Sequence, residues 1–185
     1  MKIVGIIPAR KGSKRLKHKN VYLLKGVPLI EYTIKAALES RYFTKDNLYV
    51  NSDFDKVLDI AQNYDLNLIP RPEYLSQDTT WTQSVIDHTD EVIGNLEDED
   101  IIVILQANSP QITSEKIDEC INMLLKNNLW QVNTIDGLMI NNGAIQVLKR
   151  KVKHHFGKAN YNGVVITDWV DVHSIEDIKK LEKIT

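Results

Sequence analysis

The chain has 185 residues, of which 43% are hydrophobic and 26% charged, and this suits one globular domain with a sizeable core. Its one cysteine, Cys120, excludes an internal disulfide framework and a cysteine-rich zinc site. No apolar run approaches the roughly 18 to 20 residues of a membrane span, and the apolar start of the chain is too short for a signal-peptide core. We therefore expect a soluble, cytoplasmic protein with a single domain over residues 1–185 and no membrane partner.

The charge is unevenly distributed along the chain, although the formal net charge is only −2. Residues 1–30 hold eight basic residues and no acidic one, which leaves 15 basic against 25 acidic residues in the remainder. Domains with a general attraction to nucleic acid are usually strongly basic, so no nucleic-acid partner is expected. A basic segment on an otherwise acidic chain instead predicts a local anion site.

Apolar patterning predicts alternating strands and helices over the first two thirds of the chain. Strands are expected at 2–8, 47–51, 66–69 and 101–105, and helices at 28–40, around 57–61, from 78 or 79 to 93, and at 114–126. Pro28 suits a first helical position, and Asp78 or Thr79 is expected to cap the third helix. The continuous apolar run at 101–105 is typical of a strand covered on both faces of a parallel sheet.

The last third is less regular. Strands are expected at 130–133, 143–148, 164–167 and 169–172, with room for antiparallel pairing among them, before a closing helix from Ser174. No repeat, low-complexity tract or linker marks a domain boundary. The pattern predicts an α/β, three-layer Rossmann-like fold with a mostly parallel central sheet, in which ligands bind beyond the carboxyl ends of the strands.

Most of the basic cluster falls in the loop after the first strand, residues 9–20, which we call the basic loop. Gly12 lets the backbone approach a ligand closely, Ser13 can donate a hydroxyl hydrogen bond, and the flanking Arg and Lys side chains supply charge for phosphate oxygens. The loop has neither the Walker sequence nor the GxGxxG fingerprint. A solvated basic stretch or an RNA-binding patch is the alternative, although the loop lacks interleaved aromatic residues that stack on bases.

The basic loop resembles the signature of the acylneuraminate cytidylyltransferases. The shared string is Ile7-Pro8-Ala9-Arg10-x-Gly12-Ser13-Lys14-x-Leu16-x-x-Lys19-Asn20, followed by Pro28-Leu29-Ile30. Four further segments follow in the family's order: Ser52-Asp53, Arg71-Pro72-Glu73-x-Leu75-x-x-Asp78, Leu105-Gln106-x-x-Ser109-Pro110 and Asn142-Gly143-Ala144. The resemblance covers residues 3–118 well and 142–182 more loosely, and it implies a nucleotidyltransferase fold.

The resemblance also implies a reaction, in which CTP and a sialic-acid-like 2-keto sugar acid give a CMP-sugar and pyrophosphate. CTP and an acidic sugar are therefore the expected partners. Arg10, Ser13 and Lys19 would hold the triphosphate and the charge developing on it, so Arg10 and Lys19 are expected to be catalytic residues. Lys14 and Arg15 would hold the leaving pyrophosphate. Asn20, Arg71 and Thr82 correspond to further nucleotide contacts, the last two around the cytosine, while Gln106 and Ser109 correspond to sugar contacts.

Structural roles stay open for several of these residues. Asn20 and Ser109 could shape turns, Thr82 could be an ordinary helix residue, and Arg71 could be a surface charge. For Asp53, beside a strand end, a helix cap is favoured slightly over a ligand.

A divalent cation, Mg²⁺ or Mn²⁺, is also implied, because the family holds one with an Asp-x-Asp pair before its last helix. The matching stretch here has Asp171 and His173, so Asp171 is the expected catalytic and metal-binding residue. Losing the second carboxylate should weaken or reposition the ion, unless Asp168 or a water on Asp171 compensates. His173 is expected to be a surface residue beside the helix cap rather than a ligand.

The middle of the chain departs from the family. About fifteen residues separate Lys126 from Asn142, where the family inserts a long excursion that supplies dimer contacts and sugar-carboxylate binding. The chain thus resembles a short member with a nearly complete nucleotide half, and a homodimer stays open. A second basic cluster, Lys149, Arg150, Lys151, Lys153, His154 and His155, could serve the carboxylate, but a solvated helix face is favoured.

Two other functions stay open. The shortened middle and His173 motivate a catalytically impaired nucleotide-binding relative with a regulatory role. The better-preserved nucleotide half motivates a nucleotidyltransferase for a different sugar.

Overall fold

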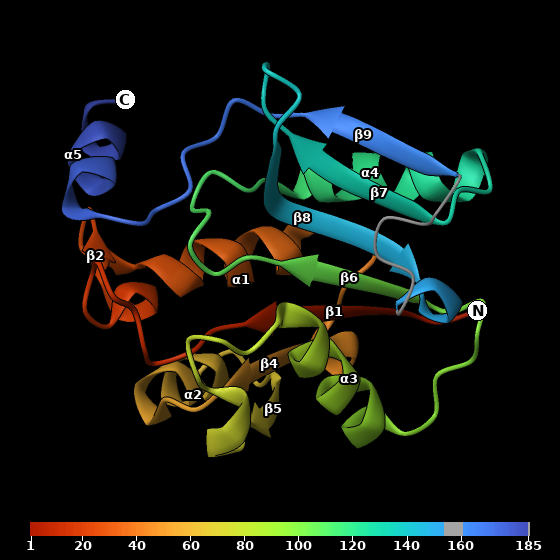
Figure 1. Cartoon of the computed structure of the whole chain (residues 1–185), viewed down its shortest axis with the longest axis horizontal. Helices are drawn as coiled ribbons and strands as arrows, with labels where there is room; N and C mark the ends of the chain where they lie inside the picture. The colour runs from red at the N-terminus through yellow and green to blue at the C-terminus, as the bar shows by residue number, and fades with distance from the viewer. Residues whose placement is uncertain (154–160, 185) are drawn as a thin grey trace.

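A seven-stranded sheet runs through the part of the chain that the computed structural model describes, residues 1–153 and 161–184. Its strands are β1 (Ile3–Pro8), β4 (Leu48–Ser52), β5 (Asn67–Pro70), β6 (Ile101–Leu105), β7 (Gln131–Ile135), β8 (Asn141–Lys149) and β9 (Asn162–Ile166). Their order across the sheet is β5-β4-β1-β6-β8-β7-β9, as Figure 1 shows. Among these seven, β8 alone runs antiparallel to its neighbours. The expected α/β fold with a mostly parallel sheet is confirmed.

Helices pack on both faces of the sheet and make three layers. They are α1 (Leu29–Glu39), α2 (Asp55–Gln62), α3 (Thr82–Ile93), α4 (Ser114–Lys126) and α5 (Ile175–Lys183). Side chains alternate along β1, so Ile7 packs with α1, α2 and α4 on one face, while Val4 and Ile6 pack with α3 on the other. All five residues of β6 are buried, as expected for the centre of the sheet. No helix of residues 1–153 or 161–184 has the length and apolar character to cross a bilayer.

The basic loop is irregular, as expected, and leads into a short 3-10 helix at Lys19–Val21. A two-stranded antiparallel ribbon of β2 (Leu23–Leu24) and β3 (Val27–Pro28) follows it. Pro28 takes the N-cap position of α1, one residue before the expected position. Leu16, Leu24 and Leu29 bury apolar surface against Ile178 and Leu181 of α5, so the chain's last helix packs beside the basic loop.

Two expected elements are wrong. Helix α3 begins at Thr82 with Trp81 at its N-cap and no side-chain cap, because Asp78 forms ion pairs with the basic loop instead of capping the helix. Residues 169–172 form no strand. The backbone there is held by the 106–113 loop: Gln111 accepts from the N–H of Val170 at 2.7 Å, and Asn108 exchanges hydrogen bonds with Val172.

The second basic cluster is not the expected solvated helix face. Lys149 ends β8 and is buried, and its Nζ lies 2.9 Å from Glu99. Arg150 donates to Asp90 at 2.9 Å, and Lys153 pairs with the same carboxylate. Because Lys149 lies opposite Ile101, where β6 begins, the cluster sits at the amino end of that strand, opposite the end where ligands are expected. His154 and His155 lie outside the described residues.

Candidate functional site

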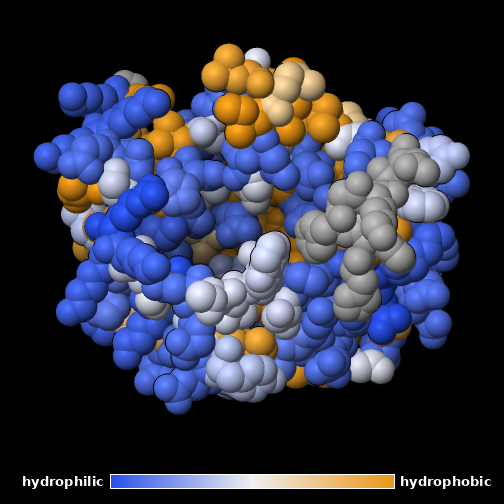
Figure 2. Space-filling view, in the orientation of Figure 1, coloured by the Kyte–Doolittle hydropathy of each residue, from blue (hydrophilic) through white to orange (hydrophobic). Residues whose placement is uncertain are grey.

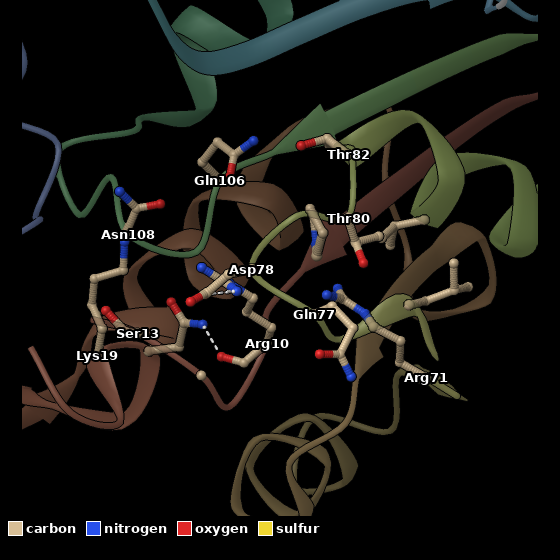
Figure 3. Close-up of a pocket in the computed structure, with 15 residues that line it drawn as sticks. Arg10, Ser13, Lys19, Arg71, Gln77, Asp78, Thr80, Thr82, Gln106 and Asn108 are labelled. Atoms are coloured by element: carbon tan, nitrogen blue, oxygen red, sulfur yellow. Dashed lines mark hydrogen bonds and ion pairs between the residues drawn. The ribbon is translucent and has the colours of Figure 1, made fainter. Parts of the chain in front are cut away.

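A cavity of about 250 Å³ opens at the carboxyl ends of the parallel strands. The basic loop after β1, the loop after β5, the start of α3 and the loop after β6 supply its lining (Figure 3). Figure 2 shows that hydrophilic residues surround a hollow on this face of the molecule. Eight residues singled out by the sequence line the cavity: Arg10, Gly12, Ser13, Lys19, Asn20, Arg71, Thr82 and Gln106.

Two cations of the basic loop converge on one carboxylate. Arg10 Nη1 donates to Asp78 Oδ1 at 2.5 Å, and Lys14 Nζ lies 3.1 Å from Asp78 Oδ2. These hydrogen bonds from Arg10 and Lys14 hold the pKa of Asp78 below its usual range. The two side chains therefore already bind an anionic group, and that group is part of the chain.

Buried polar contacts fix the path of the basic loop. Asn20 is buried, and its Nδ2 donates to the carbonyl oxygen of Arg10 at 3.0 Å. Asp53 accepts from the backbone N–H of Lys11 at 2.7 Å, and it does not cap α2, whose N-cap is Phe54. The expectation of a helix cap at Asp53 is therefore wrong, because the carboxylate is used to tie β4 to the basic loop.

Gly12 has open space beside it. A Cβ atom there would meet one neighbour in ordinary contact, Arg10 Nη1 at 3.9 Å, among the described parts of the chain. Packing within the chain therefore does not explain the glycine, and the space beside it, together with the Ser13 side chain in the same lining, is available to a ligand.

Arg71 reaches the cavity from the end of β5. It is 8% exposed, and its Nε donates to Asn51 Oδ1 at 2.7 Å while its Nη2 donates to the Asn51 carbonyl oxygen at 3.0 Å. Burial lowers the pKa of Arg71 to about 10, against the opposing charge of Asp53. Figure 3 shows the guanidinium turned toward the interior of the cavity, so Arg71 is not a surface charge.

Gln106 continues from β6 into the cavity wall. Its backbone N–H donates to Ala144 at 3.0 Å, and its carbonyl oxygen accepts from Thr33 Oγ1 at 3.0 Å. With the backbone fixed in this way, the side-chain amide points into the cavity (Figure 3).

Asp171 and Ser109 form a hydrogen-bonded pair near Lys19. Ser109 is fully buried, and its hydroxyl donates to Asp171 Oδ1. Burial raises the pKa of Asp171, against the hydrogen bond from Ser109 and the charge of Lys19. Burial also lowers the pKa of Lys19, against the charge of Asp171. A half-buried cation that lines the cavity therefore lies near a half-buried carboxylate that does not line it.

A smaller cavity of about 200 Å³ adjoins the first and shares Arg10, Ser13, Lys19 and Asp78 with it. Lys14, Arg15 and His173 complete its lining. The side chain of His173 is exposed, and its backbone N–H donates to Asp177, whose carboxylate also caps α5 through Ser174. His173 therefore lies on the surface beside the helix cap, as expected, and it also faces the basic loop.

A metal ion would have few protein ligands here. Among residues 1–153 and 161–184, no three His, Cys, Asp or Glu side chains gather into a metal-binding group. Asp168 is exposed and lies against Gly137. Mg²⁺ is commonly bound through one or two carboxylates plus substrate phosphates, so the single carboxylate of Asp171 fits an ion that phosphate oxygens mainly carry.

Sequence reasoning missed part of the site. Gln77, Thr80, Val85 and Asn108 also line the cavity. Most of them could have been found by position, because they follow the carboxyl ends of predicted strands, where ligands bind in this fold. Asn51 was missed entirely, because one polar residue in an apolar strand carries no pattern.

Comparison with known proteins shows which family the chain resembles. Residues 4–166 match the sequence profile of a family described as cytidylyltransferase. An N-acylneuraminate cytidylyltransferase of Escherichia coli O18:K1:H7 is 37% identical over 122 residues, which are 66% of this chain and 28% of that protein. A CMP-N,N'-diacetyllegionaminic acid synthase of Legionella pneumophila is 34% identical over 128 residues, covering 66% of this chain and 53% of that protein. The chain thus spans between about a quarter and a half of these relatives.

Among solved structures, a CMP:2-keto-3-deoxy-manno-octonic acid synthetase complexed with CTP superposes with a TM-score of 0.76. The match covers 100% of this chain and 98% of that one at 16% identity. At this identity, the likeness establishes the shared fold.

Proposed function

This chain belongs to the cytidylyltransferase family, and we propose that it transfers CMP from CTP to a sialic-acid-like 2-keto sugar acid with release of pyrophosphate. The observation that carries the proposal is the convergence of Arg10 and Lys14 on Asp78, a carboxylate that lines both of the adjoining cavities. These cations bind an anion where this fold places its ligands. The relatives named for acylneuraminate and diacetyllegionaminate support an acidic nine-carbon sugar as the acceptor.

The basic loop would hold the triphosphate. Arg10 and Lys19 line the same cavity, and Ser13 lies between them in the loop. Lys14 and Arg15 line the adjoining cavity and would hold the β- and γ-phosphates that leave as pyrophosphate. Because two guanidinium groups and two ammonium groups face one ligand, charge developing on the phosphates in the transition state is stabilised at fixed positions.

In the reaction, the anomeric hydroxyl of the sugar acid attacks the α-phosphorus. The new P–O bond forms as the bond from the α-phosphorus to the α,β-bridging oxygen breaks, pyrophosphate leaves, and the hydroxyl proton passes to solvent. Most of the rate would come from positioning and charge stabilisation, as in other phosphoryl and nucleotidyl transfers.

Base and sugar would lie on different walls of the cavity. Arg71 and Thr82 would contact the cytosine and its surroundings. Asn20, whose side chain donates to the carbonyl oxygen of Arg10, would also contact the nucleotide. Gln106 would hydrogen-bond the sugar. The Ser109 hydroxyl is turned to Asp171, so we assign it to holding that carboxylate rather than to the sugar.

Asp171 would hold a divalent cation, Mg²⁺ or Mn²⁺. Bound there, the ion would neutralise charge on the phosphate oxygens. Ser109 donates a hydrogen bond to this carboxylate, and the positive charge of Lys19 favours its ionised form.

The proposal is tested by incubating the protein with each of the four nucleoside triphosphates, Mg²⁺ or Mn²⁺, and a panel of acids. The panel contains N-acetylneuraminate, N,N'-diacetyllegionaminate and 2-keto-3-deoxy-manno-octonate, and mass spectrometry identifies the products. We expect a CMP-sugar with CTP and one of the first two acids. A CMP-sugar of the third acid alone would indicate a transferase for a different sugar. CTP binding without any product would contradict the enzyme proposal and favour the regulatory relative.

A further inference from the structure

We propose that Asn51 and Thr89, neither of which lines the cavity, are positioning residues that aim Arg71 at the nucleotide. The inference rests on the proposed function, since it assumes that the ligand of the cavity is CTP. Asn51 lies in β4 and Thr89 in α3, and both are fully buried.

Arg71 is held by two hydrogen bonds to Asn51. A guanidinium group is a rigid planar fork of five N–H donors. Two of its nitrogens, Nε and Nη2, donate to the side-chain and backbone oxygens of Asn51 at 2.7 and 3.0 Å. Two contacts to one residue fix the plane of the fork, so the donors on its other edge are directed into the cavity (Figure 3).

The Asn51 amide is oriented by its contact with Thr89. The Thr89 hydroxyl donates to the carbonyl oxygen of Val85, one turn earlier in α3, at 2.8 Å. Its one proton is thus committed, so toward Asn51 it acts as an acceptor, and Asn51 Nδ2 donates to it at 2.9 Å. His88 Nδ1 lies 3.3 Å from the same amide nitrogen. The amide oxygen is therefore turned to Arg71.

The orientation matters because the flipped amide is unfavourable. A flipped Asn51 would direct N–H donors at Arg71 Nε and would place its oxygen against the hydroxyl oxygen of Thr89, whose proton Val85 already accepts. Both contacts would be lost inside a buried region, where unsatisfied polar groups are costly. Thr89 thus determines, through Asn51, which way Arg71 points.

The same asparagine also connects Arg71 to the basic loop. The carbonyl oxygen of Asn51 accepts from the backbone N–H of Ala9 at 3.0 Å as well as from Arg71. Figure 1 shows β4 between β1 and β5, the strands from which the basic loop and Arg71 extend. A change in the Asn51 side chain therefore acts on Arg71 while the backbone contact to Ala9 stays.

The test is the pair Thr89→Val and Thr89→Ser. Valine keeps the branched shape without the hydroxyl, so the amide of Asn51 loses its fixed acceptor. We expect the Kd for CTP, measured by calorimetry, to rise about tenfold, since a hydrogen bond to a charged group is the contact weakened. The KM for CTP should rise in parallel while kcat changes little. Thr89→Ser, which keeps the hydroxyl, should restore the wild-type Kd.

A double-mutant cycle with Arg71→Ala separates positioning from general damage. If Thr89 acts through Arg71, Thr89→Val should not weaken CTP binding further once Arg71 is alanine. Thr134→Val is the matched control, since Thr134 is also fully buried but bonds to Asn142 and Ile145 in another part of the sheet. It should leave the Kd for CTP unchanged. Should Thr89→Val not fold, Thr89→Ala removes the same hydroxyl from a smaller side chain.

Unchanged CTP binding by Thr89→Val, or additive losses in the cycle, would overturn the inference. CTP binding without turnover would contradict the proposed function alone, because the cycle is read from binding. If the wild type turns over CTP but the losses of CTP binding in Thr89→Val and Arg71→Ala add, the positioning role is contradicted and the proposed function is not.

Discussion

Asp78 accepts a 2.5 Å hydrogen bond from Arg10 across 68 residues of sequence, and this ion pair ties the loop after β5 to the basic loop. Lys14 approaches the other carboxylate oxygen. In the proposed function, the triphosphate binds these same two cations. Asp78 therefore supplies negative charge that an incoming ligand has to displace.

Replacing Asp78 with asparagine should tighten CTP binding, because the competing charge is removed while the side-chain size is kept. Exposed ion pairs are weak, so the expected decrease in Kd is about two- to fivefold, and it should shrink as salt is added. Calorimetry at low and high salt measures it. Asp65→Asn, an equal change of charge at an exposed residue that pairs with Lys45, is the control. Weaker binding in Asp78→Asn would show that Asp78 assists the ligand instead.

Replacing Arg10 with alanine should abolish turnover while the fold stays intact. The guanidinium group is partly exposed and contributes to the lining rather than to the core, so thermal unfolding should change little. Steady-state rates and a melting curve measure the two effects. The exposed Lys56 on α2 offers a control, since Lys56→Ala removes one positive charge away from the cavity. An unchanged rate in Arg10→Ala would contradict the role given to the basic loop.

Replacing His173 with aspartate should raise the Mg²⁺-dependent rate, because it adds a second oxygen ligand near Asp171. The backbone N–H of His173 that donates to Asp177 is unaffected by the change. The rate is measured as a function of Mg²⁺ concentration, with His173→Asn as the uncharged control of similar size. Loss of activity in the aspartate variant would mean that the imidazole has a positive role of its own.

The second basic cluster should affect stability rather than binding. Burial works to raise the pKa of Asp90, but the hydrogen bonds from Arg150 and Lys153 outweigh it and hold that pKa below its usual range. A carboxylate with a lowered pKa stabilises the folded state above its unfolded pKa of about 4, and this contribution is lost as the pH falls through the lowered value.

Asp90→Asn should therefore lower the free energy of unfolding by about 1 to 3 kcal/mol at pH 7. The difference from the wild type should shrink as the pH is lowered below about 4. Urea unfolding at a series of pH values measures both effects. A difference that stays constant down to acid pH would show that the ion pairs with Arg150 and Lys153 do not stabilise the fold.

The sequence was sufficient to predict the helices and strands that are determined by the pattern of their own residues. The apolar run of β6 and the amphipathic repeat of α4 were predicted with the observed bounds, because burial on two faces and a helical period are both written in consecutive residues. Tertiary contacts decided the rest. Asp78 does not cap α3, because its carboxylate pairs with Arg10. Residues 169–172 form no strand, because the side chains of Asn108 and Gln111 bind their backbone.

The site divides in the same way. The basic loop was recognisable because its charges and glycine are adjacent in sequence. Asn51 was not, since its partners Arg71 and Thr89 come from other elements and meet it through the fold. The cations from Lys149 to Lys153 looked solvated because their acidic partners are 50 or more residues earlier.

The central claim is that this cavity activates CTP for transfer to an acidic sugar. The most direct measurement is pyrophosphate release from CTP by the wild type and by Lys19→Ala, with a divalent cation and either N-acetylneuraminate or N,N'-diacetyllegionaminate. We predict release by the wild type that requires both CTP and the sugar acid, and none by Lys19→Ala. No release by the wild type with any of these acids, or equal release by the variant, would contradict the claim.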